Sequence, residues 1–100
     1  MDRPPRTREE ILAILAHEKP ALQKRFPLKR LALFGSFARG DQNKNSDVDI
    51  LVDVDPSIGL EFVSLAETIE NALGIRVDLV SQRAVTSRRM QVIAPELIDV

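Results

Sequence analysis

The sequence predicts a domain of the α/β (α+β) class, with a small three- to four-stranded mixed sheet and helices packed against it. Short runs rich in Val, Ile and Leu, typical of strands, occur at residues 31–34, 47–55 and 76–80. Amphipathic patterns typical of helices lie before and between these runs. The chain has 100 residues, which corresponds to one small domain with a single core of modest size.

The first helix is expected to begin after Thr7, and residues 1–6 are expected to form a flexible arm. Thr7 and Glu10 have the spacing of a capping box. An apolar stripe on this helix is formed by Ile11, Leu12, Ile14 and Leu15. We expect the helix to end before Pro20, since proline disfavours helical geometry in the residue that precedes it. A second short helix is predicted over residues 20–26, with Pro20 in its first turn.

The stretch from Leu31 to Asp55 carries the features that indicate function. A buried strand leads into Gly35 and Ser36. A short helical turn over 37–39 and then a polar loop over 41–46 are expected after them. Gly35 permits a turn that a side chain would obstruct, and it allows a ligand to approach the backbone. Ser36 is expected at or near the N-cap of the helical turn, where a hydroxyl and free N–H groups suit a phosphate.

The strand that follows the polar loop has one apolar face and one acidic face, because alternate side chains of a strand point to opposite sides. The apolar face consists of Val48, Ile50, Val52 and Val54, and the acids of the other face are Asp47, Asp49, Asp53 and Asp55. Like charges side by side repel, so at least the first two acids need a neutralising partner. Mg²⁺ takes oxygen ligands and shares its remaining positions with substrate phosphates. We therefore predict a metal site at Asp47 and Asp49, with Asp53 and Asp55 solvated.

A third carboxylate is expected at Asp78 on the next strand. Ile75, Val77 and Leu79 form the apolar face there, so Asp78 points away from it, in phase with the acidic strand. Arg39 follows the Gly-Ser turn closely enough for its guanidinium to contact two phosphate oxygens. A plain surface position for Arg39 is equally compatible with the sequence. Phe34 and Phe37 are expected to pack around the turn.

Two better-known motifs are excluded. Gly35 and Gly40 have the glycine spacing of a P-loop, but Asp41-Gln42 stands where Lys-Ser or Lys-Thr is required, and an acid there would repel phosphates. The polar loop begins like an EF-hand at Asp41. However, the required glycine is Ser46, and the twelfth position is Val52 instead of a bidentate Glu.

The second half of the chain predicts structural elements without chemistry. A helix over 60–73 has apolar residues at three- and four-residue steps, and Gly74 is a suitable C-terminal stop. Thr86 or Ser87 is expected to cap a helix that Pro95 interrupts. The form of the last apolar segment, residues 97–100, is left open by the pattern.

Composition narrows the function classes. The chain contains no Cys, which excludes disulfides and thiolate metal sites. The first six residues lack the apolar core of a signal peptide, and no apolar run approaches the ~20 residues of a membrane span, so we expect a cytoplasmic protein. The net charge of −1 does not favour nucleic acid as a partner. The single histidine, His17, is expected at the end of the first helix, and the acids account for the chemistry without it.

The central string resembles a known family. Gly35-Ser36, ten residues and Asp47-Val48-Asp49 match the G-S-x10-D-x-D signature of the DNA polymerase beta-like nucleotidyltransferase superfamily. The version LFGSFARGDQNKNSDVDILV is similar to the minimal nucleotidyltransferases of bacteria and archaea. The resemblance is close over this string and looser from about Thr7 to the C-terminus. It implies the nucleotidyltransferase fold, with residues 1–100 as one minimal domain.

The resemblance also implies an activity, cofactors and a partner. ATP would donate AMP to an acceptor hydroxyl with two Mg²⁺ ions held by Asp47 and Asp49. Asp78 would bind the metal nearer the acceptor and help to deprotonate its hydroxyl, while Gly35 and Ser36 would hold the β- and γ-phosphates. Minimal nucleotidyltransferases are commonly paired with HEPN-domain toxins, and the chain would act as an antitoxin that adds AMP to a tyrosine of such a toxin.

Two alternatives stay open. The chain could be an antitoxin that neutralises its partner by binding alone, although the three acids and the Gly-Ser turn are all present. It could also transfer a nucleotide to a small molecule. Larger relatives use a second domain to bind nucleoside and acceptor, and almost nothing follows the third strand here, which disfavours that alternative.

Overall fold

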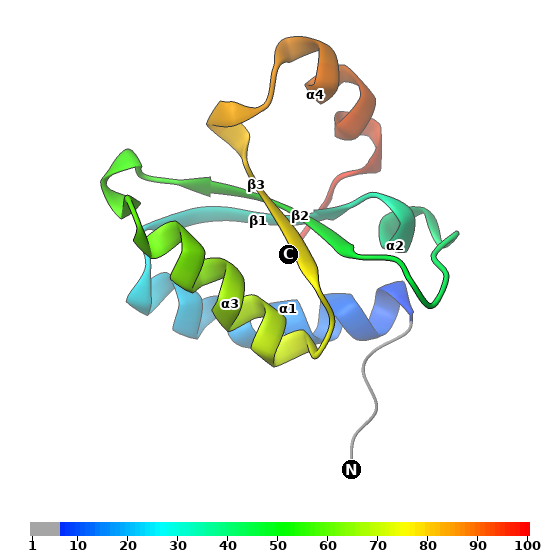
Figure 1. The fold of residues 1–100 in the computed structure, drawn as a ribbon, viewed down its shortest axis with the longest axis horizontal. Helices are drawn as coiled ribbons and strands as arrows, with labels where there is room; N and C mark the ends of the chain where they lie inside the picture. The colour runs from blue at the N-terminus through cyan, green and yellow to red at the C-terminus, as the bar shows by residue number, and fades with distance from the viewer. Residues whose placement is uncertain (1–6) are drawn as a thin grey trace.

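The computed structural model describes residues 7–100 as a four-stranded mixed sheet with helices on both faces (Figure 1). The predicted α+β class is confirmed, and the arm expected at residues 1–6 lies outside the described residues. The elements are α1 Arg8–Arg25, β1 Leu28–Phe34, α2 Ser36–Arg39, β2 Val48–Val54, η1 Pro56–Ile58, α3 Glu61–Leu73, β3 Val77–Ser81, η2 Gln82–Ala84, α4 Ser87–Ile93, η3 Ala94–Glu96 and β4 Ile98–Asp99, where η denotes a 3₁₀ helix.

The sheet has the strand order β3-β2-β1-β4. β1 pairs antiparallel with β2, with Leu31 opposite Val52, and antiparallel with β4. β2 and β3 are parallel, since α3 crosses between them and returns the chain to the same end of the sheet. The last apolar segment, whose form the sequence left open, therefore supplies an edge strand. β1 also begins at Leu28, three residues before the predicted start.

The two faces of the sheet are covered unequally. α1 and α3 lie on one face, where they bury the even-numbered residues of β2 in the main core (Figure 1). A smaller cluster on the opposite face contains Phe34, Leu51 and Ile93, with Met90 and Leu97 packed against it. This second face is covered mainly by the segment that includes α4. The acidic side of β2 shares this face, because Asp49 and Leu51 are both odd-numbered.

The prediction of two helices before β1 is wrong. α1 runs without a break from Arg8 to Arg25, with Pro20 inside it, and His17 is consequently an exposed residue in its interior. Proline there removes one i→i−4 hydrogen bond, but the carbonyl that loses its partner belongs to the exposed Ala16. Leu22 and Phe26 remain 3% exposed in the core. Their burial stabilises the last turns by about 2 kcal/mol per side chain, which offsets a proline cost of about 3 kcal/mol.

We expect Pro20→Ala to stabilise the protein by about 1–2 kcal/mol, because it restores a helical hydrogen bond while some unfolded-state entropy is regained. Thermal or urea unfolding followed by circular dichroism measures the change. Pro56→Ala is the control, since Pro56 opens η1, where no N–H is needed. A midpoint for Pro20→Ala that is unchanged or lower would contradict this account of α1.

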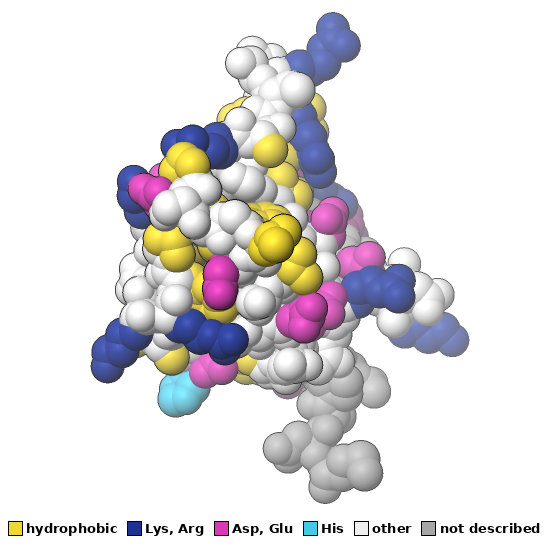
Figure 2. Space-filling model, turned by 60° about the vertical axis from the view of Figure 1, so that its left-hand side comes forward, with side chains coloured by type: hydrophobic (Ala, Val, Ile, Leu, Met, Phe, Trp, Pro, Cys, Tyr) yellow, Lys and Arg dark blue, Asp and Glu magenta, His cyan; other side chains and the backbone are white. Residues whose placement is uncertain are grey.

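The other elements agree with the sequence. Thr7 and Glu10 form both hydrogen bonds of the capping box, Gly74 ends α3 in the left-handed conformation, and Thr86 caps α4. In residues 7–100, no helix combines the length and the apolar character that crossing a membrane requires. On the face shown in Figure 2, Lys and Arg side chains are spread around the margin and form no continuous basic patch.

Candidate active site

The centre of the site is a pair of carboxylates on adjacent strands. Asp49 of β2 and Asp78 of β3 are direct partners in the parallel register. Both lie on the sheet face opposite the main core, as their parity predicts. Asp49 is half-buried and Asp78 is exposed, so one carboxylate lies against the protein and the other meets solvent. Asp47 is exposed immediately before β2 begins.

Asp78 and Asp47 both act on Asp49 electrostatically. The pKa of Asp49 is raised from 3.8 to about 6, first because burial disfavours its charged form and then because Asp78 and Asp47 are negative. Arg39 and Arg89 favour the charged form and so lower this pKa. A carboxyl that titrates near neutrality beside two other acids is typical of a site that receives a cation. Asp49 is the group that such a cation would affect most.

The donor set suits Mg²⁺ held jointly with a substrate. Within residues 7–100, no three Asp, Glu, His or Cys side chains converge on one point as a ready-made metal centre. Mg²⁺ does not need such a cage, since it usually binds through one or two carboxylates and takes its other oxygens from water and substrate phosphates. Asp49 and Asp78 supply oxygens from adjacent strands, and Asp47 lies within electrostatic range. The residues present therefore fit the predicted ion.

Gly35 lies directly against Asp49. A Cβ atom added to Gly35 would be 2.9 Å from Cγ and 3.0 Å from Cβ of Asp49, and it would overlap Oδ2. The backbone of Gly35 has φ 78° and ψ −155°, a region that essentially only glycine adopts. Phe34 is the register partner of Asp49, so β1 delivers Gly35 to this position. The Gly-Ser turn and the acidic strand are thus one packed unit.

Ser36 is the first residue of α2, and Gly35 is the N-cap. Since Gly35 has no side chain, the first turn of α2 receives no side-chain cap. The turn is closed by Arg39 N–H, which donates to the Gly35 carbonyl at 3.0 Å, and Arg8 donates to the Ala38 carbonyl at 2.9 Å. Phe37 and Ala38 are buried, which anchors the opposite side of α2. Ser36 and the adjacent N–H groups are the predicted phosphate ligands.

Arg39 is engaged by two carboxylates. Its Nε donates to Asp41 Oδ2 at 3.0 Å, and its Nη1 donates to Glu96 Oε2 at 2.7 Å. These two bonds raise the pKa of Arg39 above its ordinary value. Asp41, which the sequence placed in the loop without a role, is thus an ion-pair partner. The predicted contact of Arg39 with a phosphate stays a prediction, and it requires the guanidinium to share its donors.

Sequence reasoning missed two charged residues near the site. Glu96 accepts a hydrogen bond from the Gly35 N–H at 3.1 Å as well as from Arg39. Nothing in the local sequence indicates this contact, since 61 residues separate the partners. Arg89, on α4, is close enough to lower the pKa of Asp49. The basic pair Arg88-Arg89 was the only signal for it.

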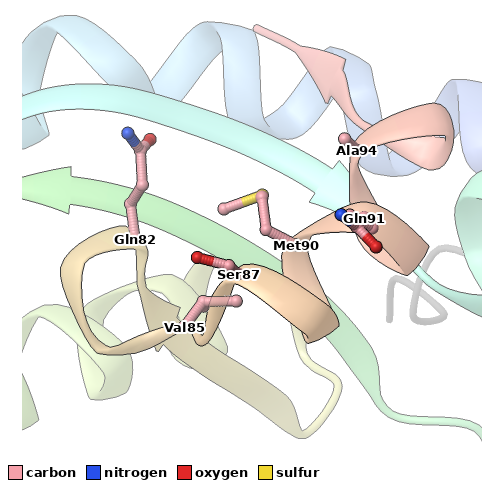
Figure 3. A pocket seen from close by; sticks show the side chains of 6 residues that line it. All are labelled: Gln82, Val85, Ser87, Met90, Gln91 and Ala94. Carbon is pink, nitrogen blue, oxygen red and sulfur yellow. The ribbon is translucent and has the colours of Figure 1, made fainter.

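A shallow pocket lies on the same sheet face, between η2 and α4 (Figure 3). Its lining side chains are Gln82, Val85, Ser87, Met90, Gln91 and Ala94. Met90 lies in the middle of this group (Figure 3). Met90 also packs against the smaller cluster. The pocket therefore lies where α4 covers this face of the sheet incompletely.

The fold and the Gly-Ser/acidic-strand unit define a nucleotidyl-transferring class of domain. The chain belongs to the nucleotidyltransferase domain family, whose model matches residues 18–97. It is 42% identical over 96 residues to the protein adenylyltransferase MntA of Thermococcus cleftensis, an alignment that covers 94% of this chain and 96% of that protein.

Solved structures agree with this membership. A chain in a toxin–antitoxin complex with AMP-PNP superposes with a TM-score of 0.65 and 29% identity, covering 92% of this chain and 70% of that one. A chain in the complex of a tri-AMPylated Shewanella oneidensis HEPN toxin with an MNT antitoxin has a TM-score of 0.57 and 25% identity. That match covers 92% of this chain and 66% of the other. The predicted nucleotidyltransferase fold is confirmed.

Proposed function

We propose that this chain is a Mg²⁺-dependent protein adenylyltransferase that moves AMP from ATP to a tyrosine hydroxyl of a HEPN-domain toxin and thereby acts as its antitoxin. Family membership and similarity to a protein adenylyltransferase support the reaction type. The similarity to chains in a toxin–antitoxin complex with AMP-PNP and in a complex with an AMPylated HEPN toxin supports the nucleotide and the partner.

One observation carries the proposal, namely the packing of Gly35 against Asp49 with Asp78 as the register partner of that same acid. The packing supports the proposal because the turn that would bind phosphates lies beside the carboxylates that would bind a cation. A triphosphate on Ser36 and the first turn of α2 would thus have its remaining oxygens next to Asp49. Positioning and charge neutralisation are the main requirements of phosphoryl transfer.

The residues divide the work as follows. Ser36 and the N–H groups of α2 bind and orient the β- and γ-phosphates, while Asp47 and Asp49 would hold Mg²⁺ together with Asp78 on the acceptor side. When bound, Mg²⁺ neutralises negative charge on the phosphates and the departing pyrophosphate. The acceptor oxygen forms a bond to the α-phosphorus as the bond from that phosphorus to the bridging oxygen breaks. The hydroxyl proton passes to the Asp78 carboxylate, and pyrophosphate leaves.

The test is intact-mass spectrometry of a HEPN-domain protein encoded in the same genome, after incubation with this chain, ATP and Mg²⁺. We expect a mass increase of one or more AMP units that is lost when EDTA replaces Mg²⁺. Peptide mapping is expected to place the AMP on a tyrosine. The double variant Asp47→Ala/Asp49→Ala is expected to give no increase while it still forms the complex.

Other outcomes lead to different functions. Undiminished transfer by the double variant would refute the assigned acids. A stable complex without any mass change from the wild-type chain would instead support an antitoxin that works by binding alone. Incorporation of AMP into a small molecule without a partner would refute the proposed acceptor.

A further inference from the structure

The carboxylate of Glu96 bridges both ends of α2. Oε1 accepts the Gly35 N–H at 3.1 Å, just before α2 begins, and Oε2 accepts Arg39 Nη1 at 2.7 Å, on its last residue. The Glu96 side chain is 21% exposed, whereas that of Arg39 is 47% exposed. The hydrogen bond from Gly35 is partly buried and the one from Arg39 is exposed, so solvent screens the bond to Gly35 less than the bond to Arg39.

A four-residue helix needs such external support. Helix formation has a costly nucleus, and α2 has too few internal hydrogen bonds to hold its own geometry. Arg8 and the buried Phe37 and Ala38 fix the side of α2 that faces the core. On the other side, Glu96 ties the N-cap to the last residue. One carboxylate therefore helps to set the orientation of the first-turn N–H groups.

The bridge also reaches the catalytic acid indirectly. Gly35 donates its N–H to Glu96 and places its Cα against Asp49. A shift of Gly35 by a fraction of an ångström would either displace the Asp49 carboxylate or remove the contact that holds it in place. Glu96 itself is held by its neighbours in the chain. β4 pairs with β1 directly after it, and Arg30 forms a two-bond ion pair with Asp99 at 2.7 and 3.1 Å.

We propose that Glu96 is a positioning residue for nucleotidyl transfer: its two oxygens hold the Gly35-Ser36 turn and the Arg39 guanidinium in the orientation that receives the triphosphate and seats Asp49. This inference rests on the proposed function. Glu96 lies outside the G-S-x10-D-x-D string, 61 residues after Gly35. If the ion pair served stability alone, its loss would lower the free energy of unfolding and leave the kinetic constants unchanged.

The experiment compares Glu96→Gln, Glu96→Ala and the control Asp41→Asn in AMP transfer to the HEPN-domain protein with Mg²⁺. Asp41 bonds the same arginine, whereas the Gly35 N–H donates to Glu96, which makes Asp41→Asn the matched control. We expect Glu96→Ala to lower kcat/KM for ATP about 100-fold, through both a higher KM and a lower kcat. Glu96→Gln keeps an acceptor for the Gly35 N–H, so its kcat/KM is expected to fall about 10-fold. For Asp41→Asn the expected decrease in kcat/KM is less than about 3-fold.

Two further measurements separate positioning from stability. The double variant Arg39→Gln/Glu96→Gln is expected to have a kcat/KM for ATP only slightly below that of the less active single variant, because the two residues act as a unit. The backbone amide resonance of Gly35 in ¹H–¹⁵N spectra is expected to move in both Glu96 variants and to stay in place in Asp41→Asn. If Glu96→Ala fails to fold, Glu96→Gln and the amide resonance still decide the question.

The opposing results are specific. A lower KM for ATP in the Glu96 variants would overturn the proposal, since it would mean that the carboxylate competes with phosphates for the Gly35 N–H and Arg39. Kinetic constants of both variants equal to those of Asp41→Asn would also overturn it. Absence of transfer by the wild-type chain would instead contradict the proposed function, so the two failures are distinguishable.

Discussion

Asp49→Asn is expected to reduce AMP transfer more than about 100-fold and, at the same time, to stabilise the metal-free protein. Asparagine has nearly the same shape, so the packing against Gly35 is kept, but the charge that would bind Mg²⁺ is lost. The gain in stability follows because the carboxylate is half-buried beside Asp78 and Asp47, which raises its pKa to about 6. Function and stability thus oppose each other at this residue.

The pH dependence has a definite sign. The folded-state pKa of Asp49, about 6, is above its ordinary value of 3.8, so the folded protein binds this proton more tightly than the unfolded chain. The contribution of Asp49 to stability is therefore fully present below pH 3.8 and is lost as the pH rises to about 6. Because solvent reaches the carboxylate, we expect Asp49→Asn to raise the free energy of unfolding at pH 7.5 by only about 1 kcal/mol.

Urea unfolding in EDTA at pH 4.5 and pH 7.5 measures this effect, and AMP transfer is assayed in parallel. Asp53→Asn is the matched control, since Asp53 is on the same strand and the same face but pairs with Arg30 across the sheet instead of with the site. The control is expected to keep its activity. A destabilised Asp49→Asn at pH 7.5, or one that retains transfer, would contradict the assignment of Asp49.

Gly35→Ala is expected to abolish AMP transfer, whereas Gly40→Ala is expected to leave most of it. Both glycines flank α2 and have positive φ angles, 78° for Gly35 and 84° for Gly40. Alanine is strained by about 1–2 kcal/mol in the left-handed region of Gly40, and by more at Gly35, whose ψ of −155° lies in a region that essentially only glycine adopts. Only at Gly35 would the new methyl group overlap the Asp49 carboxylate, since no atom lies within 4 Å of a Cβ built at Gly40.

The pair of variants separates the effect of a positive φ, which both glycines have, from the effects specific to Gly35, which are its ψ and the overlap with Asp49. Thermal unfolding is expected to show a loss in both variants, larger for Gly35→Ala, and transfer is expected to fall more than about 100-fold only in Gly35→Ala. A second readout is Mg²⁺ affinity with ATP present, which is expected to weaken in Gly35→Ala alone. Equal losses of activity in the two variants would mean that positive φ, and not the space beside Asp49, is what matters at Gly35.

Much of the candidate site could be predicted because its signals are local. Asp47 and Asp49 follow a two-residue period, so strand geometry predicts that they share one face, and Gly35-Ser36 directly follows a buried run. The antiparallel pairing of β1 with β2 then brings the turn to the acids. Asp78 was predicted from parity, and the parallel register makes it the direct partner of Asp49. The catalytic and ligand roles of these residues remain predictions that the variants above test.

The wrong and missing predictions concern contacts that are distant in sequence. The prediction that the first helix ends before Pro20 used local sequence alone. The burial of Leu22 and Phe26 in the core outweighs the local cost of proline and extends the helix past it. Residues 97–100 carry no decisive pattern, because a two-residue edge strand exists only when β1 is there to pair with it. Asp41 is an exception, because it lies in the loop as predicted and the ion pair that was missed joins it to Arg39 only two residues away.

By itself, the sequence determined the α+β class, the acidic strand and the turn that precedes it, since these depend on residue periods and on the conformational freedom of glycine. Only the tertiary structure decided that Gly35 packs directly against the Asp49 carboxylate and that Glu96 bridges the two ends of α2. The physical reason is chain separation. A contact across 61 residues leaves no periodic trace, because only the folded sheet brings η3 back to the end of β1.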